Sequence, residues 1–345
     1  MDRLGPFRGN VRARFRGFLV RDLVGVVVTG SNNSFLVETP DGALRRCAIK
    51  GKILRSLRGY YNSLAPGDRV RLEPDDFRSD QGSILGMIER RNFFWRWNEK
   101  GKSVQAIAAN LDLVVCVASA RLPPFRPRFV DRVTVTAELE NLPLLIVLNK
   151  SDLGADPETE VRLKDYARIG YEVLVCSARD GTGVEELRSR LRGTTAAFVG
   201  QSGAGKSSLL NALEPGLDAR VGEVSEKYER GRHTTTRSVM VTLRDGRTRL
   251  IDTPGFRRLA LRGIPGDSLV ACFPEMRPLA EACAYGLACG HLDEPGCRVR
   301  GGVEEGLVHP DRYESYLRVR AELDQTVEYA RKPGKPRRDY LDDDE

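Results

Sequence analysis

A glycine-rich run in the second half of the chain has the composition and spacing of a phosphate-binding loop. Positions 200–207 read Gly-Gln-Ser-Gly-Ala-Gly-Lys-Ser, between an apolar β-like run from Thr195 and an apolar helix start that reaches Leu213. The glycines allow backbone N–H groups to turn toward phosphate oxygens, and Lys206 adds charge for the β- and γ-phosphates. The hydroxyl of Ser207 is suited to Mg²⁺ at a helix start that favours anions. The predicted phosphate ligands are Gly200, Gln201, Ser202, Gly203, Ala204, Gly205, Lys206, Ser207 and Ser208.

Two shorter polar motifs, which precede this loop, are suited to reading a purine base. Asn-Lys-Ser-Asp at 149–152 follows the apolar run 144–148, and Ser-Ala at 177–178 follows the run 173–176. Both are expected at carboxyl ends of strands, where open α/β sheets bind ligands. The carboxylate of Asp152 can accept from N1–H and the exocyclic amine of guanine, a donor pair that adenine lacks. The predicted base ligands are Asn149, Lys150, Ser151, Asp152, Ser177 and Ala178.

Two motifs after the phosphate loop are suited to sensing a third phosphate. Asp-Thr-Pro-Gly at 252–255 closes an apolar strand, so that Asp252 can hold Mg²⁺ through water and the Gly255 N–H can contact the γ-phosphate. The run Gly-Arg-His-Thr-Thr-Thr at 231–236 offers a threonine, taken as Thr235, that would reach Mg²⁺ only when the γ-phosphate is present. The predicted Mg²⁺ ligands are Ser207, Thr235 and Asp252.

Near the end of the chain, three cysteines and a histidine fall within 15 residues, separated by turn-like polar residues. Three thiolates and one imidazole suit tetrahedral Zn²⁺, and an odd total of seven cysteines argues against a disulfide framework. We therefore predict one structural zinc ion per chain, in a reducing compartment; buried free thiols remain the alternative. The predicted zinc ligands are Cys283, Cys289, His291 and Cys297.

The composition is that of a folded protein with a polyanionic partner. A length of 345 residues suggests two or three domains. With 41% hydrophobic and 30% charged residues, the composition is that of a globular protein. No apolar run approaches the roughly 20 residues that span a bilayer, and a secretory leader is not apparent, so a cytoplasmic location without membrane contact is expected. Residues 1–102 hold 20 Lys and Arg against 11 Asp and Glu, which favours a nucleic acid partner over a merely solvated basic surface.

The elements that must position these motifs fall into successive regions. Residues 1–17 are predicted as a flexible basic arm. Five short strands within 18–95 indicate a closed barrel, with the OB-fold as the best candidate; it would bind RNA or serve only as structure. The polar stretch 90–102 is predicted as a linker. Strands and helices alternate over 100–262, which indicates a parallel α/β sheet. The remainder is predicted as a zinc-binding domain with a C-terminal helix, 263–330, and a disordered tail, 331–345.

The order of the nucleotide motifs is rotated relative to ordinary small GTPases, in which the phosphate loop comes first. Circular permutation leaves such a site intact because the site depends on spatial contacts. The chain resembles the circularly permuted GTPases that depend on the small ribosomal subunit, the RsgA/YjeQ family of bacteria. The motifs that carry this resemblance are 149–152, 177–178, 200–208, 231–236, 252–255 and the Cys₃His set.

The resemblance covers roughly residues 20–330 and implies an OB-fold, a permuted GTPase domain and a zinc-binding domain. It also implies a late factor in 30S subunit maturation that binds 16S rRNA and hydrolyses GTP on the subunit, here as an expected monomer. Two departures stand out. The spacing from Cys283 to Cys289 is one residue longer than in many members, and the N-terminal strands match loosely, so individual rRNA contacts do not transfer.

Catalysis is expected to need a partner. The water-orienting glutamine that usually follows the Asp-x-x-Gly motif is replaced by Phe256, which cannot hydrogen-bond water. We predict slow intrinsic hydrolysis with Lys206 and His233 as catalytic residues, while contact with the partner alone remains an open role for His233. Close spacing also predicts coupling between the segment after Gly255 and the zinc module. An ATP-using kinase and a non-catalytic RNA scaffold are less consistent with Asp152 and with the complete phosphate and Mg²⁺ set.

Overall fold

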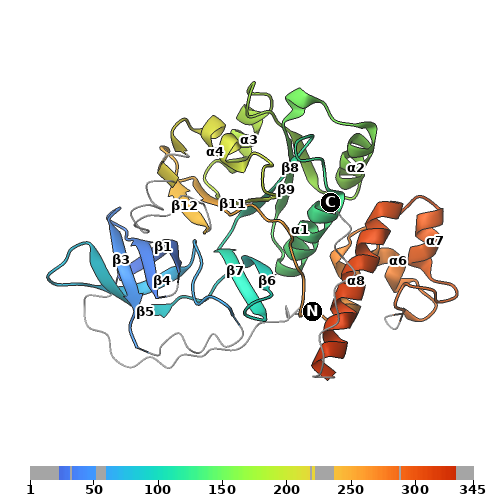
Figure 1. The fold of residues 1–345 in the computed structure, drawn as a ribbon, viewed down its shortest axis with the longest axis horizontal. Helices are drawn as coiled ribbons and strands as arrows, with labels where there is room; N and C mark the ends of the chain where they lie inside the picture. Colours follow the sequence, from blue (N-terminus) through green and yellow to red (C-terminus); the bar gives the residue numbers. More distant parts are fainter. Residues whose placement is uncertain are drawn as a thin grey trace.

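The computed structural model describes residues 23–31, 33–51, 60–217, 220–221, 237–286 and 289–331. The predicted basic arm, the motif at 231–236 with His233 and Thr235, and the tail from residue 332 lie outside these residues. Three parts follow one another along the chain (Figure 1): a barrel, a central α/β sheet and a helical part. A two-stranded hairpin of β6 and β7 lies at one end of the sheet, between the barrel and the helical part (Figure 1).

The N-terminal part is a closed five-stranded barrel with strand order β1-β2-β3-β5-β4, which confirms the prediction. Neighbouring strands are antiparallel except β3 and β5, which run parallel. Alternate side chains such as Val27, Phe35, Val37, Leu72 and Ile84 fill the barrel core. The strands are β1 Leu23–Ser31, β2 Ser34–Glu38, β3 Leu44–Ile49, β4 Arg69–Pro74 and β5 Gln81–Met87.

The prediction of a polar linker over 90–102 is wrong. Strand β6 (Phe93–Asn98) pairs antiparallel with β7 (Ser103–Ala109). Phe94 and Trp95 are fully buried, and the indole N–H of Trp95 donates to Glu140 Oε1 at 3.0 Å. The polar residues of β6, Arg96 and Asn98, both donate to the side-chain amide oxygen of Gln105 in β7. The hairpin is therefore a structural joint rather than a spacer.

The central sheet has the order β10-β9-β8-β11-β13-β12 and is parallel except for the edge strand β12. Helices α1 and α2 cover one face, and α3 and α4 cover the other, so both faces of the strands are buried. This burial explains the nearly continuous apolar runs. The strands are β8 Leu113–Ser119, β9 Leu144–Asn149, β10 Glu172–Val175, β11 Thr195–Gly200, β12 Val239–Thr242 and β13 Arg249–Asp252. The helices are α1 Pro127–Glu140, α2 Pro157–Arg168, α3 Val184–Leu191 and α4 Lys206–Leu213, with a short turn η2 at Ser151–Leu153.

The C-terminal part is helical and packs around Phe273, Met276, Val299 and Tyr316, with Trp95 of the hairpin in the same cluster. The long helix α8 begins at Pro310, as predicted, and none of the described helices is long and apolar enough to cross a membrane. The elements are η3 Gly266–Ser268, η4 Val270–Cys272, α6 Arg277–Glu281, α7 Arg298–Glu304 and α8 Pro310–Arg331.

A buried ionic network fixes the helical part against the central sheet. Asp131 of α1 is 1% exposed and accepts from Arg312 (2.8 Å), Tyr166 (2.6 Å) and Ser315 (2.5 Å). Arg312 of α8 is fully buried and also pairs with Glu275 at 2.8 Å. Since these side chains come from α1, α2, α8 and the segment before α6, the network determines how the helices meet.

Candidate nucleotide and metal sites

The phosphate loop joins β11 to α4 and depends on glycine at two positions with positive φ. Gly203 has φ +80° and Gly205 has φ +91°, and a Cβ on Gly205 would lie 2.3 Å from Asn149 Nδ2. Lys206 is 7% exposed, and burial lowers the pKa of its ammonium group. Its Nζ donates to the carbonyls of Gly200 (3.1 Å) and Gln201 (3.2 Å), which holds the cation inside the loop.

The base motifs lie beside this loop although they come earlier in the chain. Asn149, at the end of β9, donates through Nδ2 to the Ala204 carbonyl at 3.0 Å. Its Oδ1 accepts from the Ala178 N–H at 3.1 Å. One buried amide therefore ties both base motifs to the phosphate loop. Lys150 adds a second tie, since its Nζ donates to the carbonyls of Gly203 (2.7 Å) and Leu122.

Asp152 lies in η2, next to the second base motif. Its Oδ1 accepts from the Ser177 hydroxyl at 2.9 Å, and the guanidinium of Arg179 lies 3.7 Å from its Oδ2. The carboxylate is therefore held in one orientation, as the predicted role of accepting from two donors of one ring edge would require. Sequence reasoning did not single out Arg179, although it directly follows the Ser-Ala motif.

At the end of β13, Asp252 meets the requirements of a cation site. The side chain is 4% exposed, and among the described residues no donor reaches its Oδ1. Burial raises the pKa of Asp252 to about 6, against the opposing charge of Lys206. A buried carboxylate oxygen without a donor is costly unless a cation or water satisfies it. Together with the exposed Ser207 in the first turn of α4, it fits Mg²⁺.

The Asp-x-x-Gly motif lies directly on the phosphate loop. A Cβ on Gly255 would lie 2.6 Å from Ser202 Cα, so only glycine permits this approach. The Phe256 N–H donates to the Gly200 carbonyl at 3.1 Å, and the Ser202 N–H donates to the Phe256 carbonyl at 3.3 Å. The γ-phosphate sensor predicted from sequence is therefore placed beside the phosphate loop.

The four predicted zinc ligands form one buried cluster, in which all ligand atoms lie within 4.8 Å of one another. His291 Nδ1 lies 3.6 Å from Cys283 Sγ and 3.5 Å from Cys297 Sγ. A tetrahedral zinc ion, with Zn–S of about 2.3 Å and Zn–N of about 2.0 Å, requires S···N separations of about 3.5 Å. The donor set and its spacing therefore fit Zn²⁺.

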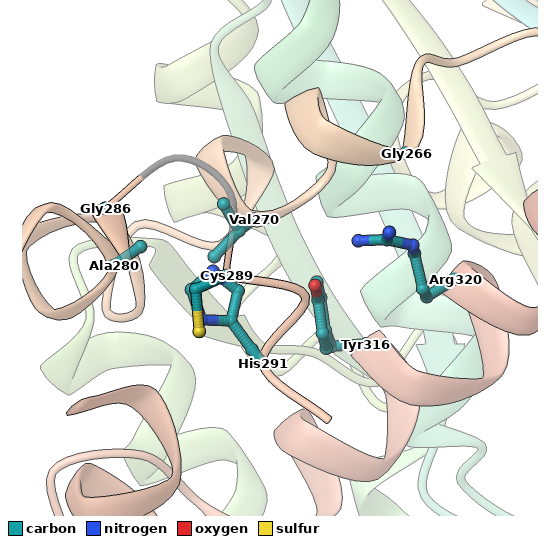
Figure 2. Close-up of a pocket in the computed structure, with 8 residues that line it drawn as sticks. All are labelled: Gly266, Val270, Ala280, Gly286, Cys289, His291, Tyr316 and Arg320. Atoms are coloured by element: carbon teal, nitrogen blue, oxygen red, sulfur yellow. The ribbon is translucent and has the colours of Figure 1, made fainter. Parts of the chain in front are cut away.

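Surrounding hydrogen bonds hold this cluster in place. The Tyr313 hydroxyl donates to the His291 carbonyl at 2.6 Å, and the Tyr316 hydroxyl donates to the Gly290 carbonyl at 2.9 Å. Figure 2 shows His291 and Cys289 side by side, with Tyr316 beyond the imidazole and Arg320 past Tyr316. The cavity between them measures about 20 Å³, room for a single water rather than an organic ligand.

The structure thus brings together the phosphate loop, the base motifs and the Asp-x-x-Gly motif along one edge of the sheet, in a permuted chain order. It does not place His233 or Thr235, which lie outside the described residues. Sequence reasoning missed two supports of the site. Leu122 offers its carbonyl to Lys150, and the Thr253 hydroxyl donates to the Phe198 carbonyl at 2.7 Å. Leu122 belongs to none of the predicted motifs, and Thr253 lies within the Asp-Thr-Pro-Gly motif but was given no role.

Known proteins resemble this chain in sequence and architecture. The family model described as RsgA GTPase matches residues 87–262. A relative from Chlorobaculum parvum, named "Small ribosomal subunit biogenesis GTPase RsgA", is 40% identical over 310 residues, which is 88% of this chain and 99% of the relative. The crystal structure of YjeQ from Thermotoga maritima matches with a TM-score of 0.67 and 31% identity over 88% of this chain and 98% of that one. YloQ, described as a circularly permuted GTPase, matches with a TM-score of 0.64 and 26% identity over 94% and 100%. The chain belongs to the RsgA GTPase family.

Proposed function

We propose that this protein hydrolyses GTP to GDP and phosphate during late maturation of the 30S ribosomal subunit. The observation that carries the proposal is the junction at Asn149, whose amide joins the phosphate loop to the base motifs at 3.0 and 3.1 Å. This junction sets Lys206 and Asp152 along one side of the sheet, as a single nucleotide requires. The relative from Chlorobaculum parvum carries small-subunit biogenesis in its name, which supports the biological setting.

The preference for guanine rests on Asp152. Its carboxylate is already held by the Ser177 hydroxyl at 2.9 Å, so it can meet the two guanine donors with little reorganisation. Adenine presents no such pair, so its binding would leave the Asp152 carboxylate without these two donors. The Ala178 N–H, which donates to Asn149 Oδ1 at 3.1 Å, is proposed to take guanine O6 as a second acceptor when the nucleotide binds.

Hydrolysis is proposed to depend on charge neutralisation and on a partner. Lys206 and the loop amides would hold the phosphates, with Mg²⁺ at Ser207, Asp252 and the predicted Thr235 to neutralise charge on their oxygens. Phe256 is 3% exposed, so no group directly after Gly255 is available to orient water. His233 is proposed for that role, and the small subunit is proposed to stimulate hydrolysis.

Binding of 16S rRNA is proposed for the barrel side of the molecule. Nine of the 20 Lys and Arg among residues 1–102 fall in two sequence segments, 1–22 and 52–59. Such local excess of positive charge favours a phosphate backbone. We further propose that the protein acts as a monomer in the cytoplasm.

The deciding experiment is phosphate release from GTP and from ATP, each with and without 30S subunits. We expect release from GTP alone to be slow, to rise by orders of magnitude with subunits, and to exceed release from ATP in both cases. The Asp152→Ala variant should lose the preference for GTP, while the Arg190→Met variant, changed on the exposed side of α3, should behave as the parent. Equal turnover of ATP and GTP, or no effect of subunits, would contradict the proposal.

A further inference from the structure

The residue that follows the γ-phosphate sensor is held by a side chain from the hairpin. In β6 the guanidinium of Arg96 lies over the ring of Phe256, with Cζ 5.7 Å from the ring centroid. The same ring meets Phe129 of α1 at a centroid distance of 6.3 Å. Because Phe256 is only 3% exposed, its ring is fixed by contacts from both the hairpin and the central domain.

The main chain of Phe256 transmits this constraint to the nucleotide site. Its N–H and carbonyl pair with Gly200 and Ser202 of the phosphate loop at 3.1 and 3.3 Å. Gly255 directly precedes it and approaches the Ser202 backbone so closely that a Cβ would lie 2.6 Å from Ser202 Cα. The Phe256 ring is thus attached to a main-chain segment that is held directly against the phosphate loop, with the Gly255 amide next to it.

The guanidinium of Arg96 contacts the Phe256 ring and forms no ion pair among the described residues. Its Nε donates to the Gln105 amide oxygen at 3.0 Å, and no carboxylate of the described residues lies within ion-pair distance. The side chain is half-buried, and burial lowers its pKa. A cation that loses water without gaining a counter-ion is stabilised by the negative face of an aromatic ring.

The same hairpin also holds the chain just beyond the switch. The backbone N–H of Trp97 donates to the Ala260 carbonyl at 3.1 Å, and the Glu99 carboxylate pairs with Arg262 at 3.2 Å. The hairpin is itself fixed to the barrel, because the Asn110 amide donates to the Gly67 carbonyl at 2.9 Å. The segment from Phe256 to Arg262 is therefore supported along its length by the element that joins barrel and sheet.

We propose that Arg96 is a positioning residue for GTP hydrolysis, which acts through the Phe256 ring to hold the Gly255 amide where the γ-phosphate binds. This inference rests on the proposed GTPase function. Because GDP has no γ-phosphate, the contribution of Arg96 applies to the triphosphate and not to the diphosphate.

The test compares the Arg96→Met and Arg96→Lys variants with Arg190→Met, an exposed arginine of α3, as control. The measurements are the dissociation constants of GDP and of a non-hydrolysable GTP analogue, and kcat. For Arg96→Met we expect about tenfold weaker analogue binding and about tenfold lower kcat, with GDP binding unchanged. Arg96→Lys should lie between this variant and the parent, since it keeps the charge but not the planar group.

A double-mutant cycle with Phe256→Leu tests the route. If Arg96 acts through the ring, Arg96→Met should cause no further loss in the Phe256→Leu background. Additive losses, or equal weakening of GDP and analogue binding, would overturn the inference while leaving the GTPase proposal intact. Failure of the parent protein to bind or hydrolyse GTP would instead overturn the proposed function. Arg96→Lys and Phe256→Leu keep the test decisive if Arg96→Met is poorly folded.

Discussion

The two interfaces that flank the central sheet are built by different chemistry. Toward the helical part, a buried ionic network around Asp131 and Arg312 is added to an apolar cluster that includes Val135 of α1. Toward the barrel, Val28 and Leu36 pack against Phe94 and Met240 in one apolar cluster. Beside this cluster the Thr29 hydroxyl of the barrel donates to the Ser238 carbonyl at 3.0 Å, and Glu38 of β2 pairs with Arg249 of β13 at 3.7 Å.

This difference indicates different mechanical roles. Charge pairs and hydrogen bonds are directional, so the ionic interface accepts one arrangement and is costly to leave half-paired. Apolar contact is non-directional and tolerates small displacements. We therefore expect the helical part to be held rigidly on α1, and the barrel to adjust its position with less loss of free energy.

Removal of zinc should have the largest effect on stability, and this effect should be confined to the helical part while the barrel stays unchanged. Structural zinc contributes several kcal/mol or more to folding, so chelation should unfold the loops around Cys289 and His291 and expose the Tyr313 and Tyr316 hydrogen bonds. Amide exchange should rise over residues 281–298 and stay low in β1–β5. The measurement is hydrogen exchange with and without chelator, alongside zinc content by mass spectrometry. A zinc-free chain with unchanged protection would contradict this prediction.

Breaking the ionic network should come next. Arg312→Met leaves Glu275 buried without its cation and Asp131 with Arg162 alone, at 3.3 Å. We expect a loss of about 3–5 kcal/mol in the free energy of unfolding. Urea denaturation gives the value. Arg318→Met, on the half-exposed side of the same helix, should cost less than about 0.5 kcal/mol. Similar values for both would show that the interface does not depend on the network.

Truncating the apolar interface should cost less. Leu36→Ala removes a buried side chain from the cluster with Phe94 and Met240, and we expect a loss of about 2–3 kcal/mol in the free energy of unfolding. Leu44→Ala in the same barrel is a matched control, because Leu44 is 39% exposed. A loss for Leu36→Ala that equals the loss for Arg312→Met would remove the contrast between the interfaces.

The Thr29 hydrogen bond should have the smallest effect. Thr29→Val keeps the shape and removes the donor to Ser238, with an expected loss of about 1 kcal/mol. Thr29→Ser keeps the hydroxyl and should restore most of this loss. Both values come from the same urea titrations, and a Ser variant no better than the Val variant would mean that packing, not the hydrogen bond, matters at this position.

Local patterns predicted the parts of this molecule that depend on local geometry. The phosphate loop was predictable because glycine adopts positive φ values such as those of Gly203 and Gly205 far more readily than other residues. The barrel followed from short runs separated by turn residues, and the permuted motif order followed from Asp152 and Lys206. The zinc set followed from ligand type and spacing alone.

Long-range contacts explain what could not be predicted. The polar residues of 90–102 predict a linker, whereas in the structure the Gln105 amide across the hairpin accepts from both Arg96 and Asn98. The pairing of Asp131 with Arg312 joins residues 181 positions apart. No sequence period records such a contact, since it arises from the packing of α1 against α8. The roles of His233 and Thr235 stay predictions.

The position of β11 between β8 and β13 determines how a mechanical force on the protein would reach the phosphate loop. The chain enters β8 from the hairpin and leaves β13 for the helical part. The barrel side and the helical part are therefore each attached to a strand that lies next to β11, which leads into the phosphate loop. Tension applied to either attachment acts first on the middle of the sheet and not on its rim. A large particle that gripped the barrel and the helical part in mismatched orientations would shear β11 against its two neighbours and distort the nucleotide cradle directly.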